Sequence, residues 1–90
     1  MSTLNAAEIT EKVSHIILEN SNFKVNQIDE QSDLRTVYGI DSITFVDVVA
    51  LLEEEFNIQF ETAMLLYDNF STVDKIVQIV EKKMADSNHE

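Results

Sequence analysis

Several residue types are missing from this 90-residue chain, which has no cysteine, no proline, no tryptophan and a single glycine. Without cysteine it can form neither a disulfide framework nor a thiolate metal site. The near absence of the two strongest helix-breaking residues favours a helical protein. No segment is apolar over the length of a membrane helix, and Ser2 stands where myristoylation requires glycine. We expect one free-standing, monomeric, cytoplasmic domain over residues 1–90.

Basic residues are scarce: 17 acids against 6 bases give a net charge of −11. No lysine or arginine lies between Arg35 and Lys75, and the acids of that stretch are Asp41, Asp47, Glu53, Glu54, Glu55, Glu61, Asp68 and Asp74. This field repels nucleic acids and anionic lipid surfaces, and it attracts proteins with basic patches. Solubility alone explains the acidity as well, so charge does not decide between the two interpretations.

Apolar spacing predicts an all-α bundle of three main helices and one short helix. The expected ranges are 6–19, 42–56, 62–67 and 72–84, with a frayed tail at 86–90. Asn5 and Glu8 form a capping-box pattern before the first helix, and Ser71 or Thr72 caps the last one. The long connection over 23–41 carries many apolar residues, which predicts that it packs across the helices, and Ser32-Asp33 can open a short helical turn within it.

Three core stripes follow from the same spacing. They are Ile9, Val13, Ile16 and Ile17 in the first helix; Phe45, Val48, Val49, Leu52 and Phe56 in the second; and Val73, Ile76, Val77, Val80 and Met84 in the last. A helical projection of 42–56 places a second group beside the core stripe: Ser42, Val46, Ala50 and Glu53, continued by Ile43, Asp47 and Glu54. This group is either a binding patch with an acidic rim or a widened core stripe, and projection alone leaves both open.

Gly39 lies three residues before Ser42, so a hydroxyl stands at the start of an expected helix. A serine hydrolase needs a nearby base, but the only histidines are His15, beside a core stripe, and His89, in the expected tail. The run Asp29–Asp33 lacks the glycine and the closing glutamate of a calcium loop. We therefore expect no catalytic residue and no metal site, and we interpret Ser42 as an attachment point.

The run Gly39-Ile40-Asp41-Ser42-Ile43, followed by a helix that ends Leu52-Glu53-Glu54-Glu55-Phe56, resembles the acyl carrier proteins. Their signature is a G-x-D-S-hydrophobic turn that opens the second helix of a four-helix bundle. The resemblance implies that Ser42 carries 4′-phosphopantetheine, which a separate phosphopantetheinyl transferase moves from coenzyme A with magnesium. It also implies that Asp41 caps the helix and assists recognition.

The resemblance further implies a partner surface, which favours the binding-patch interpretation. Its apolar residues are Ile43, Val46 and Ala50, and its acids are Asp47, Glu53 and Glu54. The partners it implies are the transferase and an acyltransferase, ligase or ketosynthase with a basic docking patch.

The chain departs from the fatty-acid carriers at Ile43, Thr44 and bulky Phe45, and it lacks their proline after the second helix. The run Asp68–Val73 looks more like discrete carriers of polyketide or other specialised pathways. A carrier in fatty-acid synthesis and an unmodified acidic helical interaction module are the alternatives, and a small hydrolase using Ser42 is the third.

Overall fold

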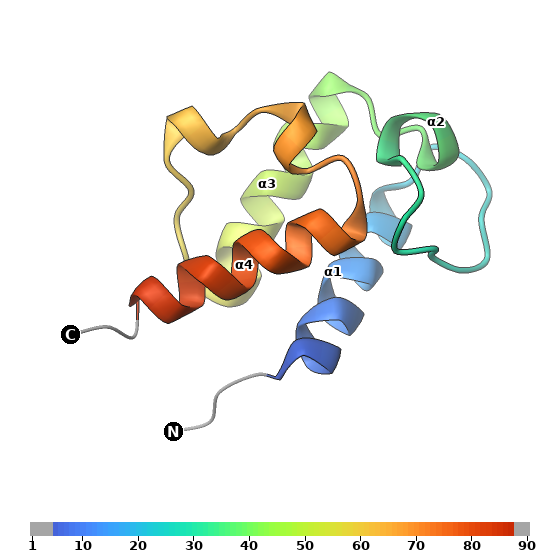
Figure 1. Ribbon diagram of the computed structural model, residues 1–90. Helices are drawn as coiled ribbons and strands as arrows, with labels where there is room; N and C mark the ends of the chain where they lie inside the picture. The colour runs from blue at the N-terminus through green and yellow to red at the C-terminus, as the bar shows by residue number, and fades with distance from the viewer. Residues whose placement is uncertain (1–4, 88–90) are drawn as a thin grey trace.

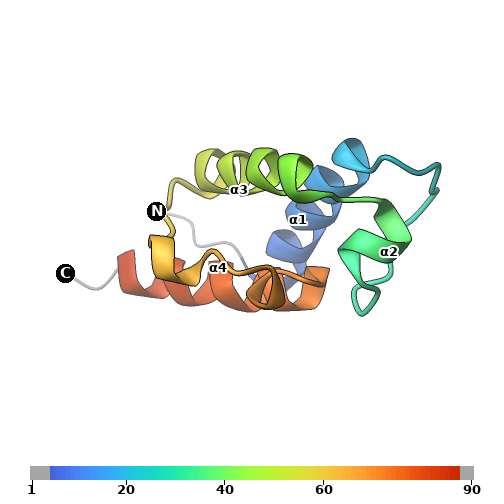
Figure 2. The same ribbon diagram turned by 90° about the horizontal axis from the view of Figure 1, so that it is seen from above.

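The computed structural model describes residues 5–87, within which there are four α-helices and two short 3-10 turns (Figure 1). The helices are α1 (Ala6–Asn20), α2 (Leu34–Tyr38), α3 (Ser42–Phe56) and α4 (Val73–Ser87), and the turns are η1 (Thr62–Met64) and η2 (Tyr67–Asn69). Helix α1 packs against both α3 and α4, and Figure 2 shows α3 and α4 on opposite sides of the molecule. The all-α class with three long helices is confirmed, and the one short α-helix of the described residues is α2, in the connection between α1 and α3.

The caps of the long helices follow from the residues that precede them. The Asn5 side chain accepts a hydrogen bond from the Glu8 N–H, and the Glu8 carboxylate accepts one from the Asn5 N–H, which completes the expected capping box. At α4, the Thr72 hydroxyl accepts from the Lys75 N–H at 3.1 Å, so Thr72 rather than Ser71 is the cap.

The core lies where the three long helices meet. The four expected core residues of α1 are buried, as are Val48, Val49, Leu52 and Phe56 of α3 and Val73, Ile76, Val77 and Val80 of α4. Phe45 and Met84 are partly buried and pack against this core. None of the helices within residues 5–87 has both the length and the apolar character needed to cross a membrane.

The connection between α1 and α3 contains the short helix α2. Asp33 caps α2 by accepting hydrogen bonds from the N–H groups of Arg35 and Thr36, at 3.1 and 3.0 Å. Leu34 and Tyr38 are buried, and the Tyr38 hydroxyl accepts from the Asp29 N–H at 2.7 Å. The connection therefore packs across the bundle, and Asp33 opens the helical turn inside it.

The short helix expected at 62–67 is not found. The structure has the separate turns η1 and η2 there, because the residues that anchor this segment are Phe60 and Phe70, which are buried on either side of it. A six-residue helix with no fully buried residue of its own would gain too little packing free energy to offset the cost of helix nucleation. Helix α4 also continues through Ser87, beyond the expected end at 84, so residues 86 and 87 are not a frayed tail. Residues 88–90, including His89, lie outside the described residues.

Candidate functional site

Ser42 is the first residue of α3 and is exposed to solvent. Asp41 before it is the N-cap: its carboxylate accepts from the Thr44 N–H at 2.8 Å, and its carbonyl accepts from the Phe45 N–H at 2.7 Å. The hydrogen bonds from the Thr44 N–H and hydroxyl lower the pKa of Asp41 below its ordinary value. Asp41 is thus a charged cap that fixes the start of α3.

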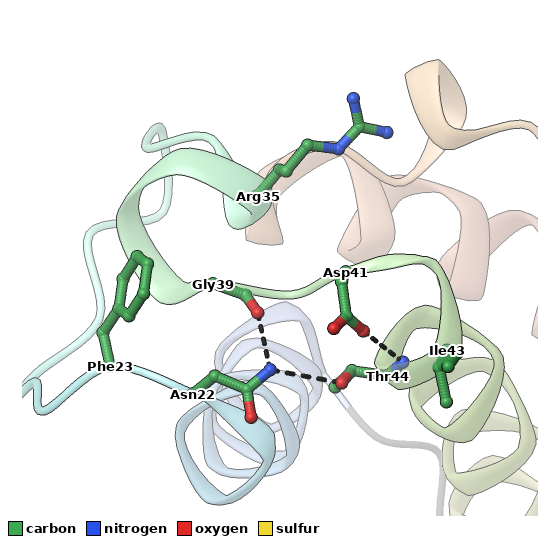
Figure 3. A pocket seen from close by; sticks show the side chains of 7 residues that line it. All are labelled: Asn22, Phe23, Arg35, Gly39, Asp41, Ile43 and Thr44. Atoms are coloured by element: carbon green, nitrogen blue, oxygen red, sulfur yellow. Dashed lines mark hydrogen bonds between the residues drawn. The ribbon is translucent and has the colours of Figure 1, made fainter.

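The turn before Ser42 is held by the residues that follow α1. Asn22 donates its backbone N–H to the Tyr38 carbonyl at 2.9 Å, and its side-chain amide donates to the Gly39 carbonyl at 2.7 Å. The same amide nitrogen donates to the Thr44 hydroxyl at 3.3 Å, on the other side of Ser42 in sequence (Figure 3). The end of α1 therefore fixes both the turn that leads to the serine and the first turn of α3.

Gly39 is the left-handed residue of this turn, with φ of 67°. A Cβ atom at this position would stand 3.0 Å from the Phe23 ring, so both the backbone angle and the packing favour glycine.

Gly39→Ala is expected to lower the free energy of unfolding by about 1–2 kcal/mol, because alanine in the left-handed region is strained. Urea denaturation followed by far-UV circular dichroism measures this loss. Asn57 ends α3 with a φ of 54° and provides the control. Asn57→Gly places glycine in a left-handed conformation and is expected not to destabilise the protein. An unchanged midpoint for Gly39→Ala would show that the turn relaxes without strain.

The side of α3 beside Ser42 is exposed. Ile43 and Val46 are 77% and 64% exposed, so they do not belong to the core stripe. Asp47, Ala50 and Glu54 are exposed on the same helix. Leu51, which the sequence reasoning did not single out, is also exposed, at 38%. The structure therefore brings apolar side chains and acids together on one exposed stretch of α3, which we call the α3 face: Ile43, Val46, Asp47, Ala50 and Glu54.

The acids of α3 differ in their bonds. The Glu53 carboxylate accepts from the Phe60 N–H at 2.9 Å and is half-buried, so it holds the chain that leaves α3. Glu55 pairs with Lys12 of α1 at 3.0 Å. Within the described part of the chain, the carboxylates of Asp47 and Glu54 accept no hydrogen bond and form no ion pair. Their charges face solvent without a structural partner.

His15, the histidine within the described residues, lines a groove that does not include Ser42. His15 on α1 lies 3.2 Å from Glu19 and lines a separate groove with Lys12 and Glu55. Among residues 5–87, no group of three or more histidine, cysteine or acidic residues is placed to hold a metal ion.

A second network joins α2 to η2. The Tyr67 hydroxyl donates to the Asp33 carboxylate at 2.8 Å and accepts from the Arg35 N–H at 2.8 Å, while the Arg35 guanidinium lies 4.1 Å from the Tyr67 ring centre. Burial and the bond to Asp33 raise the pKa of Tyr67. Desolvation would raise the pKa of Asp33, but hydrogen bonds from Thr36, Tyr67 and Arg35 outweigh it and lower the pKa.

This network predicts a loss of stability in acid. A carboxylate whose pKa is lower in the folded state contributes stability above its unfolded pKa of about 3.9, and this contribution is lost as the pH falls through the folded value. Other acids also become protonated in this range, which relieves charge repulsion and changes the stability as well. The contribution of Asp33 is therefore measured against Asp33→Asn, a variant that keeps a capping side chain but carries no charge. The difference in urea midpoint between the two proteins should be largest near pH 7 and shrink below about pH 4. A difference independent of pH would contradict this role of the Asp33 charge.

Sequence reasoning found Asp41 and Ser42 but not Asn22 or Phe23. It treated 20–22 only as the end of the first helix, and no local pattern indicates that the Asn22 amide lies across the start of α3.

Comparison with known proteins agrees with this geometry. Residues 11–80 match the family model described as phosphopantetheine attachment site. The chain is 38% identical over 77 residues to a protein named acyl carrier protein from Thermotoga maritima, covering 86% of this chain and 93% of that protein. It is 29% identical over 76 residues to one from Saccharopolyspora erythraea, covering 84% and 78%, and 29% identical over 82 residues to one from Guillardia theta, covering 91% and 99%. The match over most of the length, on a bundle whose third helix opens with the expected turn, shows that the chain belongs to the phosphopantetheine-carrying acyl carrier proteins, a family of non-catalytic carriers.

Proposed function

We propose that Ser42 is the attachment residue and that this protein delivers acyl groups to partner enzymes. The observation that carries the proposal is the exposed Ser42 hydroxyl at the first position of a helix whose start is fixed on both sides. When bound, the phosphopantetheine group supplies a thiol that holds acyl groups as thioesters.

The residues around Ser42 fit a phosphodiester. The hydroxyl is accessible to another enzyme, and the start of a 15-residue helix carries the positive end of its dipole. Asp41 is turned to the Thr44 N–H, so its charge is bound within the cap. This chain positions the acceptor hydroxyl of Ser42, and the transferase catalyses the transfer of the phosphopantetheine group.

The test is mass spectrometry of the intact protein after incubation with a broad-range transferase, magnesium and coenzyme A. We expect one phosphopantetheine adduct, and peptide fragmentation should place it on Ser42. Absence of the adduct, or its location on another residue, would contradict the proposal. The same result separates the carrier from an unmodified interaction module, which would take up nothing.

The α3 face is the proposed docking surface for the transferase and for biosynthetic enzymes such as an acyltransferase, ligase or ketosynthase. Exposed Ile43, Val46 and Ala50 supply apolar contact, and the unpaired charges of Asp47 and Glu54 suit partners with basic patches. Glu53 was also expected on this surface; because its carboxylate already accepts from the Phe60 N–H, we propose that it contributes less to docking than Asp47 and Glu54 do.

Reversing one of these charges should slow partner coupling. Asp47→Lys is expected to lower kcat/KM for the transferase by roughly tenfold at low ionic strength, with less effect at high salt, because the charge acts on the encounter rate. Glu11→Lys on α1 makes the same change in net charge outside the α3 face and is the control. Equal losses in the two variants would show that only net charge matters, and no loss in Asp47→Lys would contradict electrostatic docking on this face.

We infer further that the pathway is polyketide or other specialised biosynthesis in the cytoplasm. The support is the departure from fatty-acid carriers around Phe45, whose ring packs edge-on against Tyr67 and Phe70 at 6.1 and 5.6 Å. A carrier in fatty-acid synthesis is the alternative. The mass of the acyl group on protein isolated from its native cell distinguishes the two, and a series of saturated chains of increasing length would contradict the specialised pathway.

A further inference from the structure

A groove of about 480 Å³ opens beside Ser42. Asp41, Ile43 and Thr44, the residues on either side of the serine, form one part of its lining, and Phe23 and Gly39 form another. Figure 3 shows Phe23 and Ile43 at opposite ends, with the Gly39–Asp41 backbone running between them. Ser42 itself does not line the groove, but both of its neighbours in sequence do, so anything attached to Ser42 begins next to this groove.

The two ends of the groove are apolar and accessible. Phe23 is 53% exposed and Ile43 is 77% exposed, so each offers a large apolar surface to solvent. Because Gly39 has no side chain, the Phe23 ring lies directly on the backbone that leads to Ser42. The ring is thus held against Gly39, three residues before the attachment point, without being buried in the core.

The groove is also lined by one cationic residue. Arg35 lines it and is the only lysine or arginine among its described lining residues. Its guanidinium is fixed over the Tyr67 ring, so this charge has a defined position. A phosphodiester on Ser42 adds negative charge to a protein of net charge −11, and it is favoured on the side where Arg35 stands.

We infer that this groove binds the phosphopantetheine arm of the same molecule, with its phosphodiester toward Arg35 and its geminal methyl groups against Phe23. The inference rests on the proposed attachment at Ser42. The arm carries an anion and a branched apolar segment, and the groove is lined by one cation, Arg35, and by the apolar ring of Phe23. Attachment also raises the local concentration of the arm to the order of millimolar, so a contact too weak to form between separate molecules is populated.

The experiment uses isotope-labelled full-length protein loaded with unlabelled coenzyme A. We expect the geminal methyl protons of the arm to resonate upfield of their position in free coenzyme A, because they lie against an aromatic ring. Isotope-filtered nuclear Overhauser effects should connect them to the Phe23 ring protons. Both signals should be lost in Phe23→Ala.

Two further variants make the assignment specific. Phe23→Leu is expected to keep the Overhauser contacts, now to leucine methyls, and to lose the upfield shift. Leu66→Ala removes an apolar side chain that is 61% exposed outside the groove and should change neither signal. Circular dichroism checks that each variant keeps its helices.

The outcomes separate the two proposals. If mass spectrometry shows the adduct on Ser42 but the methyl groups keep their free shift and contact no groove residue, the groove assignment is overturned and the attachment stands. If no adduct forms on Ser42, the attachment fails first and the groove assignment falls with it.

Discussion

Ser42→Ala is expected to abolish phosphopantetheine uptake completely, leaving the intact mass unchanged after incubation with transferase, magnesium and coenzyme A. The variant removes the hydroxyl that α3 presents to solvent at its first residue. The nearest hydroxyl in sequence, that of Thr44, is half-buried and accepts a hydrogen bond from Asn22, so it does not substitute.

The fold should survive this change. The cap of α3 comes from Asp41, and the Ser42 side chain is exposed, so the far-UV circular dichroism spectrum should match that of the unchanged protein. Ser14→Ala, a serine-to-alanine change within α1, is the matched control and should load normally. A persistent adduct in the Ser42 variant would mean that another side chain is the attachment residue.

Phe70→Ala is expected to cause the largest loss of stability, about 3–5 kcal/mol. Phe70 is completely buried, and its ring packs edge-on against Phe60 and Phe45 at centroid distances of 5.2 and 5.6 Å. It therefore joins α3 to the segment that crosses from α3 to α4. Since the free energy of unfolding of a small domain is only about 5–15 kcal/mol, this single change removes a large share of it.

Urea denaturation measures the loss, and the midpoint should fall by roughly 1–2 M. Phe23→Ala is the matched control: it deletes the same atoms from a ring that is 53% exposed and should cost less than about 1 kcal/mol. Similar losses in the two variants would show that the aromatic cluster around Phe70 does not carry the packing assigned to it.

Local pattern was sufficient for the long helices and for the part of the core that these helices supply. The apolar stripe from Ile9 to Ile17 and the caps at Asn5 and Thr72 are signals carried within a few residues of each other, and the structure shows each of them. The position of Ser42 at the start of a helix was predictable for the same reason. Helical projection alone did not predict the exposure of Ile43 and Val46, because it orders side chains around a helix without showing where the neighbouring helices stop; the family resemblance favoured it.

Features that depend on contacts between residues far apart in the chain could not be predicted from the sequence. The segment 62–67 has apolar residues but no sustained helical period, and its form is decided by Phe60 and Phe70 packing together. Asn22 supports the turn before Ser42 by hydrogen bonds to Gly39 and Thr44, which lie 17 and 22 positions further along the chain. Neither residue type nor spacing indicates such a contact.

The bond between the Glu53 carboxylate and the Phe60 N–H constrains how the surface of α3 can evolve. A carrier that meets several enzymes on one helix gains selectivity by exchanging residues there, and an acid that also fixes the backbone is not free to be exchanged. The carboxylates of Asp47 and Glu54 hold no backbone group within the described structure. Substitutions at these two positions can therefore change which enzymes bind with little loss of folding stability. Redesign of this carrier for foreign enzymes should accordingly randomise positions 47 and 54 and leave 53 unchanged.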